Sequence, residues 1–174
     1  MTTPREQRIA KVLANRRHDI TVIFENVHDH HNISACLRSC DSIGIQEVFI
    51  ISSVEKKQIK LSAKSSASAA KWLTIHHYFD VKECFDDVRK KYSKIYSTRL
   101  DANAIDLYEM DFTQSIALIF GNEHDGVSEE AARLCDGNFV IPQVGMIQSL
   151  NVSVACAVTL YEAFRQRKYD LRTT

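Results

Sequence analysis

Residues 115–130, SIALIFGNEHDGVSEE, contain an apolar run, a loop bracketed by two glycines and a helix start. The run Ile116–Phe120 is apolar throughout, which is typical of a strand that helices cover on both faces. Gly121 and Gly126 let the loop backbone approach a ligand closely. Ser128, followed by two glutamates, is a favourable helix N-cap. The stretch therefore predicts a strand, a ligand-binding loop and a helix in succession.

Similar alternation extends along the rest of the chain, where ITVIF and EVFII are further apolar runs. Strands are predicted at Ile20–Glu25, Glu47–Ile51, Leu73–His76, Lys94–Thr98, Ile116–Phe120 and Asn138–Ile141. Helices are predicted at Arg5 to about Asn15, Ile33–Ile43, Val81–Tyr92, Ser128–Cys135 and Ser149–Lys168. This pattern predicts an α/β fold with a parallel sheet flanked by helices.

The composition is that of an ordinary globular protein. With 174 residues, 45% of them hydrophobic, the chain can bury a core, so we expect one domain over residues 1–174. The five cysteines are odd in number and form no CxxC pair, which favours reduced thiols and a cytoplasmic protein. The sequence lacks a membrane-length apolar run and a signal peptide, so we expect neither membrane insertion nor secretion.

Charge is balanced overall, with 22 basic and 22 acidic residues, but it is unevenly placed. Basic residues gather in three segments: Arg5, Arg8, Lys11, Arg16 and Arg17; Lys56, Lys57, Lys60, Lys64 and Lys71; and Arg165, Arg167, Lys168 and Arg172. Each run alone fits a solvated helix face. Together they suggest a phosphate-binding surface with a short basic N-terminal helix, about residues 5–17, and a basic end to the last helix.

Two further loops carry unusual chemistry, whereas neither GxGxxG nor GxxxxGK[ST] occurs. After the first strand, Asn32 lies at a helix start and Arg38 follows six residues later among small apolar residues. Arg38 is there either a snorkelling surface residue or a placed cation. Before the last helix, IPQVGMIQSLNVSV places Gln148, Ser149 and Asn151 at the mouth of that helix.

Two further features, a histidine cluster and the start of the last helix, each allow more than one interpretation. The cluster His28, Asp29, His30 and His31 could suggest a metal, but adjacent histidines point in different directions and no second ligand cluster has zinc spacing, so we expect no metal. The last helix begins with the small apolar run NVSVACAV. That run fits a buried core helix and half of a subunit interface equally well.

Three motifs carry a resemblance to a known family. NVHDHHNISACLRSCDSIG, FGNEHDGVSEE and IPQVGMIQSLNVSVACAVTLYEAFRQR, in this order, resemble the motifs of the SpoU branch of the SPOUT methyltransferases. Residues Arg16–Asn32 are similar to the N-terminal approach of the bacterial tRNA guanosine-2′-O-methyltransferases in that branch. The resemblance covers about Arg5 to Lys168.

The resemblance implies a fold and a cofactor. It implies a parallel sheet whose C-terminal part forms a deep trefoil knot, which is a rare exception to the rule against threading. It also implies S-adenosylmethionine bound in the knot loops, S-adenosylhomocysteine as product, and a homodimer that pairs through helices including the last one. By motif position, the implied cofactor contacts are Thr98, Gly121, Asn122, Ile141, Ser149 and Leu150.

The implied reaction is methyl transfer to a ribose 2′-hydroxyl of RNA, most simply a guanosine in the tRNA D-loop. The implied catalytic residues are Arg38, Asn32, Glu123, Ser149 and Asn151. Because a guanidinium has a pKa above about 12, its role as a free base is awkward. Our hypothesis is that Arg38, clamped to an RNA phosphate, stabilises the developing alkoxide, and that Asn32 fixes the arginine and the ribose.

RNA contacts are expected from the basic segments, at Arg8, Lys11, Arg16, Arg17, Arg165, Arg167 and Lys168. The sequence departs from the family in three places: His30 replaces a usual proline, NEHDG replaces NEKWG, and IPQ replaces IPM. The tRNA enzymes of the family also carry a longer C-terminal extension. An enzyme for the tRNA wobble position or for rRNA, and a noncatalytic RNA-binding homologue, therefore stay as alternatives. Glu123 has a simpler reading as an acid that flanks and caps a helix.

Overall fold

One sheet of seven strands organises the computed structural model, which describes residues 3–54, 56, 69–99, 101 and 103–167. The strands are β1 Ile20–Glu25, β2 Glu47–Ile51, β3 Thr74–Tyr78, β4 Lys94–Ser97, β5 Ile105–Asp106, β6 Ile116–Phe120 and β7 Gly137–Val140. Their spatial order is β3-β2-β1-β6-β4-β7-β5, and each neighbouring pair is parallel. The carboxyl ends of these strands therefore lie along one edge of the sheet.

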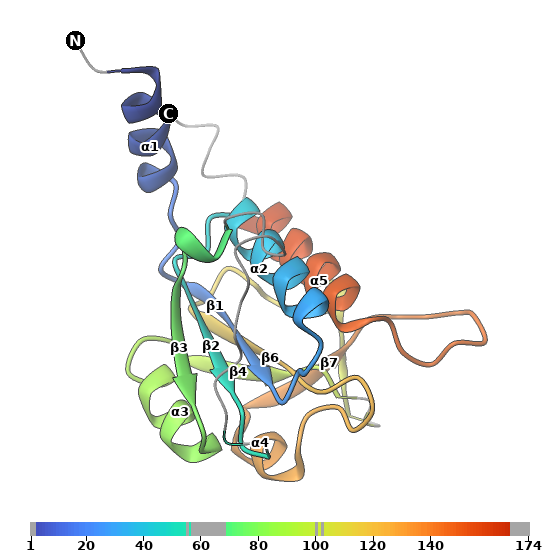
Figure 1. The fold of residues 1–174 in the computed structure, drawn as a ribbon. Helices are drawn as coiled ribbons and strands as arrows, with labels where there is room; N and C mark the ends of the chain where they lie inside the picture. The colour runs from blue at the N-terminus through green and yellow to red at the C-terminus, as the bar shows by residue number, and fades with distance from the viewer. Residues whose placement is uncertain (1–2, 55, 57–68, 100, 102, 168–174) are drawn as a thin grey trace.

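Helices cover both faces of the sheet (Figure 1). They are α1 Pro4–Ala14, α2 His30–Ser42, α3 Val81–Val88, α4 Glu129–Leu134 and α5 Val152–Arg167, with short 3₁₀ turns η1 Ala69–Lys71 and η2 Leu107–Glu109. Because strand side chains alternate, Leu118 and Phe120 of β6 pack with α2 and α5, whereas Ala117 and Ile119 pack with α3 and α4. The predicted three-layer α/β architecture is confirmed.

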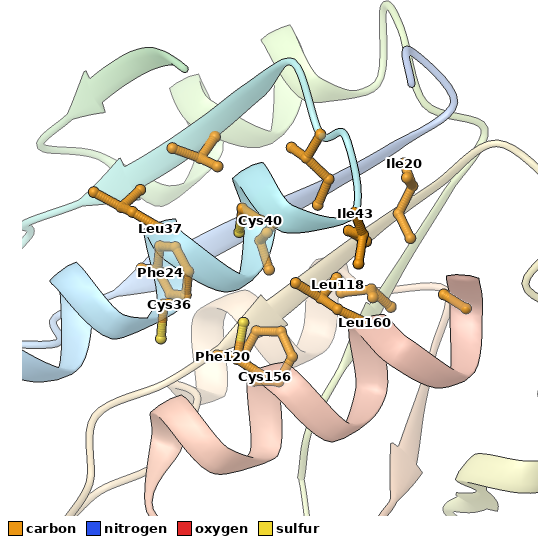
Figure 2. Packing of buried hydrophobic residues seen from close by; sticks show 14 of the residues in the cluster. Ile20, Phe24, Cys36, Leu37, Cys40, Ile43, Leu118, Phe120, Cys156 and Leu160 are labelled. Carbon is orange, nitrogen blue, oxygen red and sulfur yellow. The ribbon is translucent and has the colours of Figure 1, made fainter. Parts of the chain in front are cut away.

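The contact between α2 and α5 is lined by sulfur. Cys36 and Cys40 of α2 and Cys156 of α5 are fully buried beside Leu37 and Leu160 (Figure 2). A hydrogen bond with Cys156, together with burial, raises the pKa of the Cys36 thiol well above its ordinary value. All five cysteines are free thiols. The small residues of both helices thus pack closely. The side of the NVSVACAV run that faces α2 lies in the core, as the interpretation of a buried core helix predicts.

The predicted and observed bounds differ at helix ends and, by one or two residues, at the ends of β3, β4 and β7. β1, β2 and β6 have the predicted bounds, and α4 follows its predicted cap, Ser128. α2 begins earlier than predicted because Asp29 caps it by accepting a hydrogen bond from His31 N at 2.7 Å. α5 begins at Val152 because Asn151 Oδ1 accepts a hydrogen bond from Ser153 N at 2.8 Å. Asn151 is therefore a capping residue just outside the helix.

Other differences lie away from the motifs. α3 ends at Val88 rather than Tyr92, since backbone bonds one residue shorter than helical ones close the turn over Lys90 and Lys91. The two-residue strand β5 is absent from the sequence prediction. The knot and the single domain stay predictions. Within the described ranges, no helix is long and apolar enough to cross a bilayer.

Candidate functional site

A pocket of about 590 Å³ opens at the carboxyl ends of β4, β6 and β7. Its apolar floor includes Phe120, Phe139, Val152 and Ala155, and polar and backbone groups of the loops form its rim. Carboxyl ends of parallel strands are where α/β proteins bind ligands, and the volume falls in the range of small-molecule sites. This edge of the sheet is therefore the candidate functional site.

The loop after β6 is folded tightly by its two glycines. A Cβ atom at Gly121 would lie 2.0 Å from the carbonyl carbon of Gly126, and Gly126 itself has a φ of +67°. Two backbone hydrogen bonds between Asn122 and Gly126, at 3.1 and 2.9 Å, close the loop. Only glycine fits at position 121, because the loop packs against its own backbone there, and close approach of this backbone to a ligand stays a prediction.

The structure brings all six predicted cofactor residues to this pocket. They share its wall, and they are Thr98, Gly121, Asn122, Ile141, Ser149 and Leu150. The hydroxyl of Thr98 is already used, because it donates to the carbonyl of Ile119 at 3.2 Å. Contact between these residues and a cofactor stays a prediction, but their convergence from separate segments of the chain is a fact of the fold.

Three of the predicted catalytic residues form one hydrogen-bonded chain. Asn32 Nδ2 in the first turn of α2 donates to Glu123 Oε1 at 2.6 Å. Asn151 Nδ2, at the start of α5, donates to Asn32 Oδ1 at 3.1 Å. Glu123 and Ser149 line the pocket. The site thus joins α2, the loop after β6 and the start of α5 at the pocket mouth.

Arg38, the fifth predicted catalytic residue, does not join this chain. It is exposed on α2, about 9 Å further along the helix axis than Asn32. Within the described part of the protein, Arg38 makes no hydrogen bond or ion pair. All the donors of its guanidinium are therefore available to an incoming group.

An ion pair at the pocket wall was missed by the sequence reasoning. Arg99, directly after Thr98, pairs with Glu129 in the first turn of α4, and both residues line the pocket. The hydrogen bond from Arg99 lowers the pKa of Glu129. The only signal for Arg99 in the sequence is its place just beyond a predicted strand end.

Within the cluster at residues 28–31, Asp29 has a local structural role. The carboxylate of Asp29 caps the helix rather than pointing to a shared centre. Across the ranges that the structure describes, no three histidine, cysteine or acidic side chains are arranged to hold a metal ion.

Two of the predicted RNA contacts are corrected, because their side chains are buried. Arg16 is 2% exposed and donates to Asp41 at 2.8 Å and to the carbonyl of Ile45 at 2.7 Å. Arg167 is 4% exposed and pairs with Asp19. Both guanidinium groups lie under the surface and hold the chain around β1 together, so they do not offer their charge to RNA.

The remaining basic residues are distributed differently. Arg8, Lys11 and Arg17 line a second groove of about 570 Å³ between α1 and the end of α2, where Arg17 lies over the ring of Phe164. Arg165 is exposed but bonded to Glu162 at 2.8 Å. Lys168 lies outside the described residues. Four of the seven predicted RNA contacts thus line the groove, because Arg16 also lies on its wall, with its guanidinium turned inward to Asp41.

An all-parallel sheet with a ligand-sized pocket and a polar chain at its carboxyl edge defines an α/β protein with an enzyme-like site. The chain belongs to the SpoU rRNA methylase family, whose family model matches residues 19–161.

Three comparisons describe the family context. The chain is 43% identical over 166 residues to a tRNA (guanosine(18)-2′-O)-methyltransferase of Thermus thermophilus, covering 95% of this chain and 84% of that protein. The crystal structure of the TrmH/SpoU tRNA modifying enzyme of A. aeolicus matches with a TM-score of 0.87 and 35% identity, over 95% of this chain and 84% of that one. The SpoU methyltransferase AviRb from Streptomyces viridochromogenes, crystallised with AdoMet, matches with a TM-score of 0.76 and 28% identity, over 87% and 59%.

Proposed function

We propose that the protein is an S-adenosylmethionine-dependent tRNA 2′-O-methyltransferase that modifies a guanosine ribose in the D-loop, with S-adenosylhomocysteine as the product. The observation that carries this proposal is the convergence of two predicted sets. The six cofactor residues line one pocket, and Glu123 on that pocket is hydrogen-bonded to Asn32, which is bonded to Asn151. The position of the target follows the name of the Thermus relative.

The pocket suits this cofactor in shape and in chemistry. Its volume of about 590 Å³ and its apolar floor, which includes Phe120 and Phe139, can take an adenosine, while the loop backbones offer donors and acceptors at the rim. When bound, S-adenosylmethionine supplies a methyl group activated by its sulfonium. The absence of GxGxxG fits this pocket, since the glycine-bracketed loop after β6 replaces the dinucleotide turn.

The polar chain orients the target ribose at the pocket mouth. Asn32 is hydrogen-bonded to both Glu123 and Asn151, which would preorganise amide and carboxylate groups before RNA arrives. The hydroxyl of Ser149 lies on the same wall. These groups would hold the target ribose at the pocket mouth, and positioning supplies much of the rate in a displacement of this kind.

Arg38 supplies the positive charge of the site. Its free guanidinium would clamp an RNA phosphate and stabilise the alkoxide that develops as the 2′-hydroxyl gives its proton to a water molecule at the exposed pocket mouth. This role needs an arginine that is not already paired within the protein, and Arg38 meets that condition in the described residues.

The RNA surface extends to the groove that Arg8, Lys11 and Arg17 line. The groove lies at the C-terminal end of α2, and the polar chain begins in the first turn of the same helix. A helix of 13 residues is about 20 Å long, so a ligand that fills both places must span that distance. This separation supports a folded RNA rather than a free nucleoside as the substrate.

A homodimer is part of the proposal. Val154 and Tyr161 of α5 are 46% and 53% exposed and lie seven residues apart, on one face of the helix, and Leu150 before the helix is 38% exposed. Such a stripe is suited to a second copy of the same helix. A tRNA substrate and five free thiols also support a cytoplasmic location. Sedimentation velocity at micromolar concentration tests the dimer, and a monomer that still transfers methyl groups would contradict it.

The deciding experiment uses labelled S-adenosylmethionine, unmodified tRNA transcripts and, separately, rRNA, followed by mapping of ribose-methylated nucleotides. A matched tRNA with 2′-deoxyguanosine at the mapped position removes only the nucleophile. We expect label at the D-loop guanosine and none in the deoxy control.

Each other outcome contradicts a stated part of the proposal. Label at the wobble position or only in rRNA would overturn the substrate. No label with either RNA, despite cofactor binding by calorimetry, would overturn the enzyme and favour a noncatalytic RNA-binding protein.

A further inference from the structure

The carboxyl end of β1 holds both ends of the pocket loop. Glu25, the last residue of β1, accepts hydrogen bonds from Ser128 N at 2.9 Å and from Ser128 Oγ at 2.5 Å. The carbonyl of the next residue, Asn26, accepts a hydrogen bond from Asn122 Nδ2 at 2.9 Å. Asn122 and Ser128 both line the pocket and bracket the loop that carries Glu123. Two consecutive residues of one strand end therefore clamp the loop.

The clamp is anchored in the neighbouring strand. Asn26 has a φ of +50°, a left-handed conformation that asparagine tolerates better than most residues. Its N–H donates to the carbonyl of Ile51 at 2.8 Å, and its amide donates to Ser53 Oγ at 3.0 Å. The turn that presents the Asn26 carbonyl to the loop is thus fixed by the end of β2.

Glu25 is an unusual residue to bury for structural reasons alone. It is 1% exposed, and within the described part of the chain no lysine, arginine or histidine pairs with it. A buried carboxylate without a cation is costly unless hydrogen bonds compensate it. Both of the donors that bond to Glu25 come from Ser128, whose hydroxyl also accepts the capping bond from Ala131 N at 3.1 Å. The carboxylate therefore fixes one pocket residue at two points.

The middle of the loop depends on these ends. Residues 123–126 are exposed, and Gly121 must stay against Gly126 with no room for a side chain. A shift at Ser128 would move the pocket wall, and a shift at Asn122 would move Glu123 away from Asn32. Neither Glu25 nor Asn26 lines the pocket itself.

We propose that Glu25 is a positioning residue for cofactor binding, which acts through Ser128 and, together with the Asn26 carbonyl, sets the shape of the 121–128 loop. The proposal rests on the proposed function only in taking S-adenosylmethionine as the pocket's ligand. It assigns Glu25 no contact with that ligand.

The test compares two buried carboxylates at opposite edges of the sheet. Glu25→Gln keeps the size of the side chain but turns one acceptor into a donor, so it can satisfy Ser128 N or Ser128 Oγ–H but not both. Glu47→Gln makes the same change at the amino end of β2, away from the pocket. Binding of S-adenosylmethionine is measured by calorimetry at a temperature where circular dichroism shows each variant fully folded.

We expect Glu25→Gln to raise the Kd for S-adenosylmethionine about tenfold and to raise KM for the cofactor more than it lowers kcat. We expect Glu47→Gln to bind the cofactor with a Kd within twofold of the parent protein. Wild-type affinity in Glu25→Gln, or an equal loss in Glu47→Gln, would overturn the positioning role.

A second readout needs no cofactor. Hydrogen exchange of the Ser128 amide, followed by NMR, should speed up at least tenfold in Glu25→Gln relative to the most slowly exchanging core amides of the same variant, and should show no such excess in Glu47→Gln. Unchanged exchange in Glu25→Gln would overturn the clamp even if the cofactor binds. Failure of the parent protein to bind S-adenosylmethionine, with the exchange effect present, would instead contradict the proposed function and support the clamp.

Discussion

At the amino edge of the sheet, Glu47 accepts hydrogen bonds from Lys91 at 2.7 and 2.9 Å and from Tyr92 at 3.0 Å, and lies 2.8 Å from His76 Nε2. At the carboxyl edge, Glu123 is exposed and accepts one hydrogen bond, from Asn32. The first carboxylate is shielded and saturated by the protein. The second keeps most of its hydrogen-bonding capacity for something else.

The difference separates two uses of polar groups. A saturated cluster stabilises the fold, because removing any partner leaves a buried group unpaired. A polar chain with spare capacity at a pocket mouth adds little stability and can bind a ligand. Mutations at the amino edge should therefore lower the free energy of unfolding, whereas mutations at the carboxyl edge should weaken ligand binding or turnover.

The largest effect is expected at Arg38. Arg38→Lys keeps the charge but loses the planar fork, so kcat should fall about 100- to 1,000-fold. Because Arg38 is outside the pocket lining, the Kd for S-adenosylmethionine should stay the same. Single-turnover kinetics and calorimetry measure the two quantities. Near-normal turnover would remove Arg38 from the mechanism.

Gly121→Ala should act on binding. The new Cβ would overlap Gly126, and overpacking of this kind costs about 1–3 kcal/mol. If the loop shifts to relieve the overlap, the same free energy is lost from cofactor binding, and the Kd rises about 10- to 100-fold. Gly145→Ala is the matched control, because no atom lies within 4 Å of the position that its added methyl group would take. Equal cofactor affinity in both variants would show that the loop tolerates opening.

The amino edge should respond through stability. Glu47→Gln removes the negative charge and replaces one of the two oxygens shared by Lys91, Tyr92 and His76 with an amide donor, so we expect the free energy of unfolding to fall by about 2 kcal/mol at pH 7. Urea denaturation measures this loss. A stability equal to that of the parent would mean that the cluster is neutral.

The same cluster makes a pH prediction. Burial raises the pKa of Glu47, but its hydrogen bonds with Lys91, His76 and Tyr92 outweigh burial and leave that pKa below its ordinary value. The folded protein thus holds the ionised form more strongly than the unfolded chain does. This contribution is complete above about pH 4.5 and is lost as the pH falls through the lowered pKa. Between about pH 5 and 3 the stability of Glu47→Gln should fall less steeply than that of the parent.

The smallest effect is expected in the basic groove. Arg8→Ala combined with Lys11→Ala should raise KM for tRNA about 3- to 10-fold and reduce the salt dependence of binding, with kcat unchanged. Lys82→Ala on α3 is the control, because that lysine is 74% exposed on the opposite face of the sheet. A similar loss in both variants would point to general charge rather than to the groove.

The sequence predicted most of the sheet because burial on both faces leaves a local signature. β1, β2 and β6 are nearly all apolar and flanked by polar residues, so their ends can be found without tertiary information. β5 is only two residues long and carries no such signature. Asn151 was placed inside a helix because apolar periodicity does not distinguish a cap from a first turn. A knot depends on the path of the whole chain, which no local pattern reveals, so the knot stays a prediction that rests on the motif resemblance alone.

For the site residues too, some positions could be predicted from the sequence and others could not. The motif resemblance placed Asn32 in one site with Glu123 and Asn151, which lie 91 and 119 residues further along the chain, and the structure shows their hydrogen bonds. Arg16 and Arg167 looked like surface cations because their partners are acids distant in sequence, or a carbonyl of another segment. A run of basic residues shows only which residues are present. Whether each guanidinium is buried depends on its contacts with residues distant in sequence.

The reactivity of the three thiols between α2 and α5 can report how often these two helices separate. Their burial, together with the raised pKa of Cys36, makes them poor nucleophiles while the two helices stay in contact. An alkylating reagent can therefore react only during excursions in which α2, with Asn32 and Arg38, separates from α5. The rate of modification of Cys36 and Cys156 would time those excursions without any engineered probe.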